Sequence, residues 1–204
     1  MEPLPTSTAS RASRVDIESQ PLAIEGGSSD YHSILVIAEG GAVFMSMGPY
    51  DIPIQIGARI AAAHPVRVAQ SIDLEIGAAL AFTPIPFEHG SLKSNVVDLD
   101  VLASLGLSLE IAEALRIRFV SGMGPMMLMG GERENPFAKD VTPKKTLTLL
   151  SARGAASLEI ALTDTALISL TPLSITWAPK SSALRDNING VRRIEAGVGF
   201  GFRL

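Results

Sequence analysis

A repeat of two residues runs through the end of the chain and restricts what it can fold into. In residues 191–204, apolar side chains fill every second position from Ile194 to Leu204, and the positions between them from Glu195 on hold Glu, Gly or Arg. Side chains of a β-strand point alternately to its two faces. The segment is therefore predicted to be a strand with one apolar face and one small or charged face.

The same alternation recurs upstream, in residues 52–63, 70–82, 96–110, 114–129 and 150–162. Two further segments are less regular. In 33–47 both faces carry apolar residues, and Glu39 marks the face expected to point inward. In 166–178 the pattern changes parity near Pro172, where a β-bulge would accommodate a residue that lacks the ladder donor. The chain thus predicts eight strands, an even number of the kind that bacterial outer-membrane barrels have.

The composition limits the class of protein. Hydrophobic residues make up 47% of the chain and the mean hydropathy is +0.30. No run approaches the ~20 apolar residues of a membrane helix, whereas each predicted strand reaches the ~9–11 residues that cross a bilayer at a tilt. A net charge of −4 without a basic stripe argues against a nucleic-acid partner. The absence of cysteine excludes disulfides and thiolate metal sites.

The connections between the predicted strands differ in length. They are tight at 64–68, 112–114 and 164–165, modest at 48–51, and long and polar at 84–95, 130–145 and 179–190. Short turns at one end and long loops at the other are typical of outer-membrane barrels. We therefore predict an all-β fold over residues 33–204, an eight-stranded antiparallel up-and-down transmembrane β-barrel. Residues 1–32, rich in Ser, Thr, Pro and Gly, are predicted to be a disordered or loosely held tail.

A resemblance to a known family supports this fold. The run SARGAASLEIALTDTALISLTPLSITW, followed later by INGVRRIEAGVGFGFRL, resembles the closing strands of the small eight-stranded outer-membrane β-barrel proteins, the OmpA/OmpX-like group. The resemblance implies a monomer in the bacterial outer membrane, placed there by the barrel-assembly machinery and in contact with outer-membrane lipid and lipopolysaccharide. It also implies a structural or surface-interaction role without enzymatic activity.

The charged face of the predicted strands would fill the barrel interior. It carries Glu39, Arg59, Asp73, Glu75, Asp98, Asp100, Glu110, Arg116, Arg118, Arg153, Glu159, Arg193, Glu195 and Arg203. Interiors of small barrels are narrow enough for side chains to fill, and buried opposite charges must pair. We predict a salt-bridged plug, with a narrow small-solute pore as the alternative. Reversing the two faces gives a soluble, lipocalin-like lipid-binding barrel, but the Gly, Ala and Ser on the charged face favour the membrane version.

No residue is assigned to catalysis, to a cofactor or to a metal. His89 and Ser91 resemble the catalytic pair of outer-membrane lipid A deacylases, but their position in a Gly-containing loop favours a polar loop tip. The three histidines share no spacing typical of metal ligands. Candidates for an aromatic girdle around the barrel are Tyr50, Phe82, Phe87, Phe119, Phe137 and Trp177.

Overall fold

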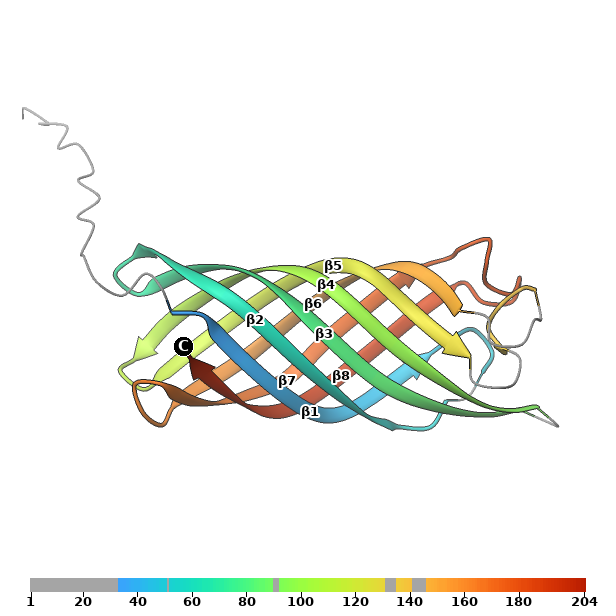
Figure 1. Cartoon of the computed structure of the whole chain (residues 1–204), viewed down its shortest axis with the longest axis horizontal. Coiled ribbons are helices and arrows are strands. Elements are labelled where there is room, and N and C mark those ends of the chain that lie inside the picture. The colour runs from blue at the N-terminus through green and yellow to red at the C-terminus, as the bar shows by residue number, and fades with distance from the viewer. Residues whose placement is uncertain (1–32, 51, 90–91, 131–134, 141–145) are drawn as a thin grey trace, which may run out of the picture.

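A computed structural model describes residues 33–50, 52–89, 92–130, 135–140 and 146–204. Eight antiparallel strands form a closed barrel in which each strand pairs with its neighbours in sequence, as Figure 1 shows. The strands are β1 (Leu35–Ser46), β2 (Gln55–Ala69), β3 (Ile72–His89), β4 (Leu92–Ala112), β5 (Leu115–Gly130), β6 (Thr146–Ala161), β7 (Ala166–Pro179) and β8 (Gly190–Arg203). The predicted fold class is confirmed. The predicted tail, residues 1–32, lies outside the described residues.

The barrel closes where the first strand meets the last. β1 pairs with β8 in a register that sets Gly41 opposite Gly197 and Glu39 opposite Gly199. Within the closed part of the barrel no strand edge is left unpaired, which is the condition for a sheet to cross hydrocarbon. Within the described residues, no helix has the length and apolar character needed to span a membrane.

The two ends of the barrel differ. The C-terminus and the turns that follow β2, β4 and β6 lie at one end (Figure 1), and these turns span only residues 70–71, 113–114 and 162–165. The β1–β2 and β7–β8 connections lie at the opposite end, together with the tip of the β3–β4 hairpin. Two predicted connections are wrong: residues 64–68 belong to β2, and most of 84–95 belongs to β3 and β4.

The extension of the β3–β4 hairpin explains how prolines enter a strand. Pro84 and Pro86 pair with Val97 and Asn95 of β4, whereas the register of β3 with β2 ends at Phe82. Proline is tolerated where a strand lacks a neighbour on one side. The hairpin therefore continues beyond the closed part of the barrel.

The predicted parity change in β7 is confirmed. Thr171 pairs with Gly197 and Ser174 with Glu195, so three steps along β7 match two along β8. The buried positions change from Thr171 to Ser174, and Pro172 and Leu173 are both exposed between them. This β-bulge keeps polar side chains inside on both sides of the proline.

The outer face of the barrel is apolar. Side chains such as Ile60, Leu105 and Phe200 are 57–58% exposed although each is large and hydrophobic. The buried charged residues point to the opposite side, into the lumen. A soluble barrel with a lipid-binding apolar interior and a charged surface is therefore wrong for this chain.

Candidate functional site

The lumen is the candidate site, because the polar side chains of all strands converge there. The structure places every charged residue predicted for the interior on an inward-facing position. Ion pairs group all of them except Arg203 in successive layers along the barrel axis.

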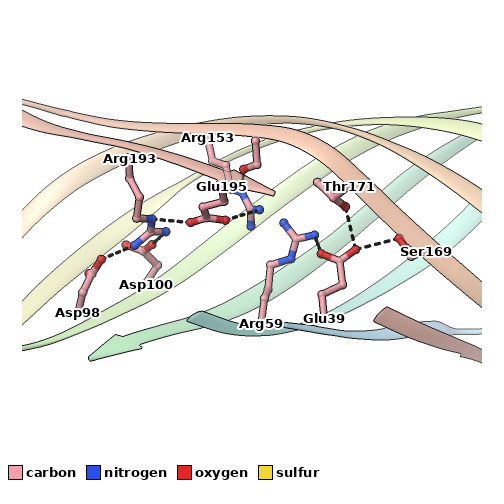
Figure 2. A network of polar contacts seen from close by, with 10 residues as sticks. Glu39, Arg59, Asp98, Asp100, Arg153, Ser169, Thr171, Arg193 and Glu195 are labelled. Atoms are coloured by element: carbon pink, nitrogen blue, oxygen red, sulfur yellow. Dashed lines mark hydrogen bonds and ion pairs between the residues drawn. The ribbon is translucent and has the colours of Figure 1, made fainter. Parts of the chain in front are cut away.

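Arg193 on β8 is the centre of the layer nearest the long loops. Its side chain is fully buried, and its two terminal nitrogens donate hydrogen bonds to Asp98 and Asp100 of β4. Its Nε also lies 2.5 Å from Oε1 of Glu195. Figure 2 shows Glu195 between Arg193 and Arg153, whose Nη2 donates to Glu195 Oε2 at 2.9 Å. Because β4 and β8 are not neighbours in the barrel, these bonds cross the lumen.

A second layer is built around Glu39. Arg59, its register partner on β2, donates to one carboxylate oxygen. Ser169 and Thr171 of β7 donate to the other, Oε1, at 2.8 and 3.0 Å (Figure 2). Arg153 Nε donates to Ser174 Oγ at 2.7 Å. Both oxygens of the buried Glu39 carboxylate are thus satisfied by donors from two sides of the barrel.

A third layer lies around Arg118 of β5. Its Nε donates to Glu75 Oε2 at 2.6 Å and lies 3.6 Å from Oε1 of Glu159. Ser108 donates to the other oxygen of Glu75. Arg118, Glu75 and Glu159 are all buried, so the single guanidinium is the shared cation of two carboxylates in this layer.

The last layer lies at the end with the short turns. Arg116 lies 3.6 Å from both Asp73 and Glu110, and Arg67 forms ion pairs with the same two carboxylates. Arg67 was not among the predicted interior residues, because the predicted strand ends at residue 63. Arg67 has an odd residue number, as the inward-facing Arg59 of the same strand does. This shared parity could have revealed that Arg67 faces the interior. Arg203 points inward but forms none of these ion pairs within the described part of the chain.

Small cavities separate the layers. One of about 30 Å³ is lined by Glu39, Arg59, Arg153 and Glu195 together with glycines of β1, β2 and β8. Another of about 20 Å³ lies among Arg59, Leu102, Arg118 and Arg153. A water molecule needs about 10–15 Å³ of such space. These cavities can hold one or two waters each, but not a solute.

An apolar cluster closes the lumen at the end with the long loops. Tyr50, Phe87 and Phe137 pack edge to face, with ring centroids 5.2–6.0 Å apart. Met126 and Leu128 of β5 are fully buried in the same cluster. The prediction that these three aromatics belong to an outer girdle is wrong. Apolar residues at the inward positions of the strand ends could have revealed this cluster.

Two connections cover the apolar cluster. Phe137, between β5 and β6, and Leu184, between β7 and β8, are both buried in it. Arg185 N donates to Phe137 O at 3.0 Å, and Lys139 N donates to Ala183 O at 2.9 Å. The loops are therefore joined to each other over the barrel mouth.

Comparisons with known proteins match this architecture. No family model and no curated protein matches the chain. Among solved structures, Neisserial surface protein A is similar over 84% of this chain and 97% of that one, with 12% identity and a TM-score of 0.61. The attachment invasion locus protein Ail of Yersinia pestis matches over 84% and 97%, with 15% identity and a TM-score of 0.52. The outer membrane enzyme PagL matches over 83% and 99%, with 11% identity and a TM-score of 0.50. The fold is that of the small outer-membrane barrels.

This likeness agrees with the predicted location in the bacterial outer membrane and with the apolar outer face. In an outer-membrane barrel, the long loops face outward and the short turns face the periplasm. The apolar cluster lies at the end with the long loops, and the layer of Arg67 and Arg116 lies at the end with the short turns. Outer-membrane barrels with this fold include a surface protein and an enzyme, so the site decides the role.

Only one member of the His89 and Ser91 pair lies within the described residues. His89 is the last residue of β3, at the tip of the hairpin that extends past the barrel, and Ser91 lies outside the described residues. Across the described residues, no group of three or more His, Cys, Asp and Glu side chains is arranged to hold a metal ion.

Proposed function

We propose that this chain is a closed, non-enzymatic barrel of the outer membrane, which conducts no solute and serves as a rigid support for its outer loops. The observation that carries the proposal is the filling of the lumen. Ion-paired layers extend from Asp73 and Arg116 to Arg193, and the apolar cluster around Phe137 follows them.

The alternative of a narrow pore needs a continuous polar path. Arg193 and its partners Asp98 and Asp100 have no exposed side-chain surface, and they connect opposite walls of the barrel. Opening this layer would separate buried opposite charges, which costs several kcal/mol per ion. Beyond it, the path would enter an apolar cluster. The geometry therefore supports a plug rather than a pore.

The surroundings of the barrel fit the remaining parts of the proposal. The apolar outer face suits outer-membrane lipid, and the outer rim suits lipopolysaccharide. The terminal strand β8, with Phe200 and Phe202 at alternate positions, suits delivery by the barrel-assembly machinery. We propose a monomer, since the lumen is filled by side chains of a single chain.

Electrical recording tests the plug. Purified protein inserted in planar bilayers should give no conductance steps, while a porin of known conductance inserted in the same bilayer reports that the assay works. Variants Asp98→Ala and Arg116→Ala should remain silent, because other layers still close the lumen. Discrete steps in the natural protein, changed in size by Asp98→Ala, would contradict the proposal and support the pore.

A hydrolysis assay tests the absence of enzymatic activity. Protein folded in detergent and incubated with ester-linked outer-membrane lipid should release no fatty acid above a heat-unfolded sample. Release that disappears in both His89→Ala and Ser91→Ala would show an active pair at the hairpin tip, and the non-enzymatic role would then be wrong.

A further inference from the structure

The outward positions of the strands contain one residue that does not fit an apolar membrane face. Among the side chains that the structure describes, Arg192 is the only Asp, Glu, Lys or Arg on an outward strand position. It is exposed, and it lies on β8 between the buried Val191 and Arg193. A charge facing lipid is costly near the middle of a bilayer and nearly free at its edge.

The height of Arg192 follows from the apolar band on its own strand. Outward residues of β8 and the C-terminus are apolar from Ile194 to Leu204. At about 3.3 Å per residue and a tilt of about 40°, this stretch covers about 25 Å of height, which equals the apolar band of an outer-membrane barrel. Arg192 is the next outward residue toward the long loops. It therefore lies at the level of the outer headgroups.

The neighbours of Arg192 are those of an interfacial site. Its register partners are Trp177 of β7, which is 49% exposed, and Ser46 of β1. Tryptophan is enriched at membrane interfaces. Lys180 follows β7 directly, next to the pair formed by Pro179 and Gly190, and is exposed. Neither Lys180 nor Arg192 forms an ion pair within the described residues, so both cations are available to a ligand.

We propose that Arg192 and Lys180, beside Trp177, bind the phosphate headgroup of a lipid in the outer leaflet. The inference rests on the proposed function, because it requires the barrel to lie in the outer membrane. Two unpaired cations complement a phosphate monoester, and charge-assisted hydrogen bonds to phosphate oxygens are among the stronger ones. The acyl chains of the lipid would lie against the apolar band below, on Ile194 and its neighbours.

Trp177 makes the site observable, since it is the single tryptophan of the chain. The protein is reconstituted in phosphatidylcholine bilayers that contain a small fraction of a lipid with brominated acyl chains, which quench tryptophan fluorescence on contact. The brominated lipid is either phosphatidic acid, a phosphate monoester, or phosphatidylcholine. We expect preferential quenching by phosphatidic acid, by about fivefold for each cation, the size expected for a basic side chain near an anionic lipid surface.

Variants assign the preference to the two cations. Arg192→Gln and Lys180→Gln should each lower the preference about fivefold, and Arg192→Lys should keep it. Lys139→Gln is the matched control, because it removes the same charge from a loop residue that pairs with Asp186 instead. Heat-dependent gel mobility checks that each variant is folded. An excess of inorganic phosphate should leave the quenching unchanged, because the bound group belongs to a lipid.

Three results would overturn the site. These are equal quenching by the two brominated lipids in the natural protein, a preference that is undiminished in Arg192→Gln, and a preference abolished by inorganic phosphate. The first two leave the membrane barrel intact. Quenching by neither lipid would instead show that Trp177 does not face a bilayer, and the proposed function would fail together with the site.

Discussion

At the scale of single residues, Arg193 forms ion pairs with three carboxylates at once, those of Asp98, Asp100 and Glu195. We predict that Arg193→Met lowers the free energy of unfolding by about 3–5 kcal/mol, because it leaves buried carboxylates without their cation. Urea unfolding in lipid vesicles measures this change. The control is Arg192→Met, at the neighbouring but exposed position, with an expected change within about 0.5 kcal/mol in phosphatidylcholine vesicles, which offer Arg192 no phosphate monoester. Equal losses in both variants would contradict the distinction between the two arginines.

The sequence allowed the inward direction of these residues to be predicted, but not their partners. Alternation is a local property, so the parity of Arg193 follows from the residues beside it. Its pairing with Asp98 depends on the stagger of β8 and β4 across the lumen, which no local pattern encodes. The pairing of Arg67 with Asp73 was missed for another reason: β2 continues past Pro65, a residue that usually ends a strand.

At the scale of strands, glycine allows β1 and β8 to close the barrel. A Cβ on Gly41 would lie 2.1 Å from the carbonyl oxygen of Ala196, in the backbone of β8, whereas a Cβ on Gly154 would meet nothing within 4 Å. Gly41→Ala should therefore destabilise the barrel by about 1–3 kcal/mol, as overpacking does. Gly154→Ala should be neutral or slightly stabilising. The urea midpoints of unfolding of the two variants measure this difference in stability. Equal midpoints would contradict the role of Gly41 in closing the barrel.

The bulge in β7 predicts opposite outcomes for two deletions of one residue. Removing Pro172 leaves one outward residue between Thr171 and Ser174, so all later side chains keep their faces and the barrel should fold. Removing Ile175 moves Thr176 outward and Trp177 inward, since a slip of one residue exchanges the faces of a strand. Heat-dependent gel mobility measures the folded fraction. A folded Ile175 deletion beside an unfolded Pro172 deletion would show that the bulge is placed wrongly.

At the scale of the whole molecule, the sequence predicted the strand number and the two faces, but not the outer closure. Toward the long loops, inward positions such as Ile85 and Met126 are as apolar as outward ones, and the contrast that reveals a strand disappears. The strands consequently extend further than predicted. Phe137 and Leu184 join the apolar cluster through contacts between loops that are distant in sequence. Such contacts depend on the closed barrel that brings the loops together.

The position of the whole barrel in the membrane can be tested with two variants, each of which places an arginine on the outer face at a different height. Leu105 is 57% exposed and lies near the middle of the outward apolar residues of β4, which run from Val97 to Ile111. Leu105→Arg should cost about 2–4 kcal/mol, the cost of arginine at the bilayer midplane. Thr148 faces outward on β6, on the loop side of the exposed Leu150, so Thr148→Arg should cost only about 0–1 kcal/mol.

Both variants are unfolded by urea in vesicles and again in detergent micelles. The comparison separates the loss of stability caused by the bilayer from losses that have other causes. The difference between the two positions should shrink in micelles, which adapt their shape to a charged side chain more readily than a bilayer does. A cost at Leu105 no greater than at Thr148 would mean that the outward face does not lie in hydrocarbon. In that case the apolar surface would have to be covered by protein, and a second copy of the chain would be the first candidate to examine by its oligomeric state.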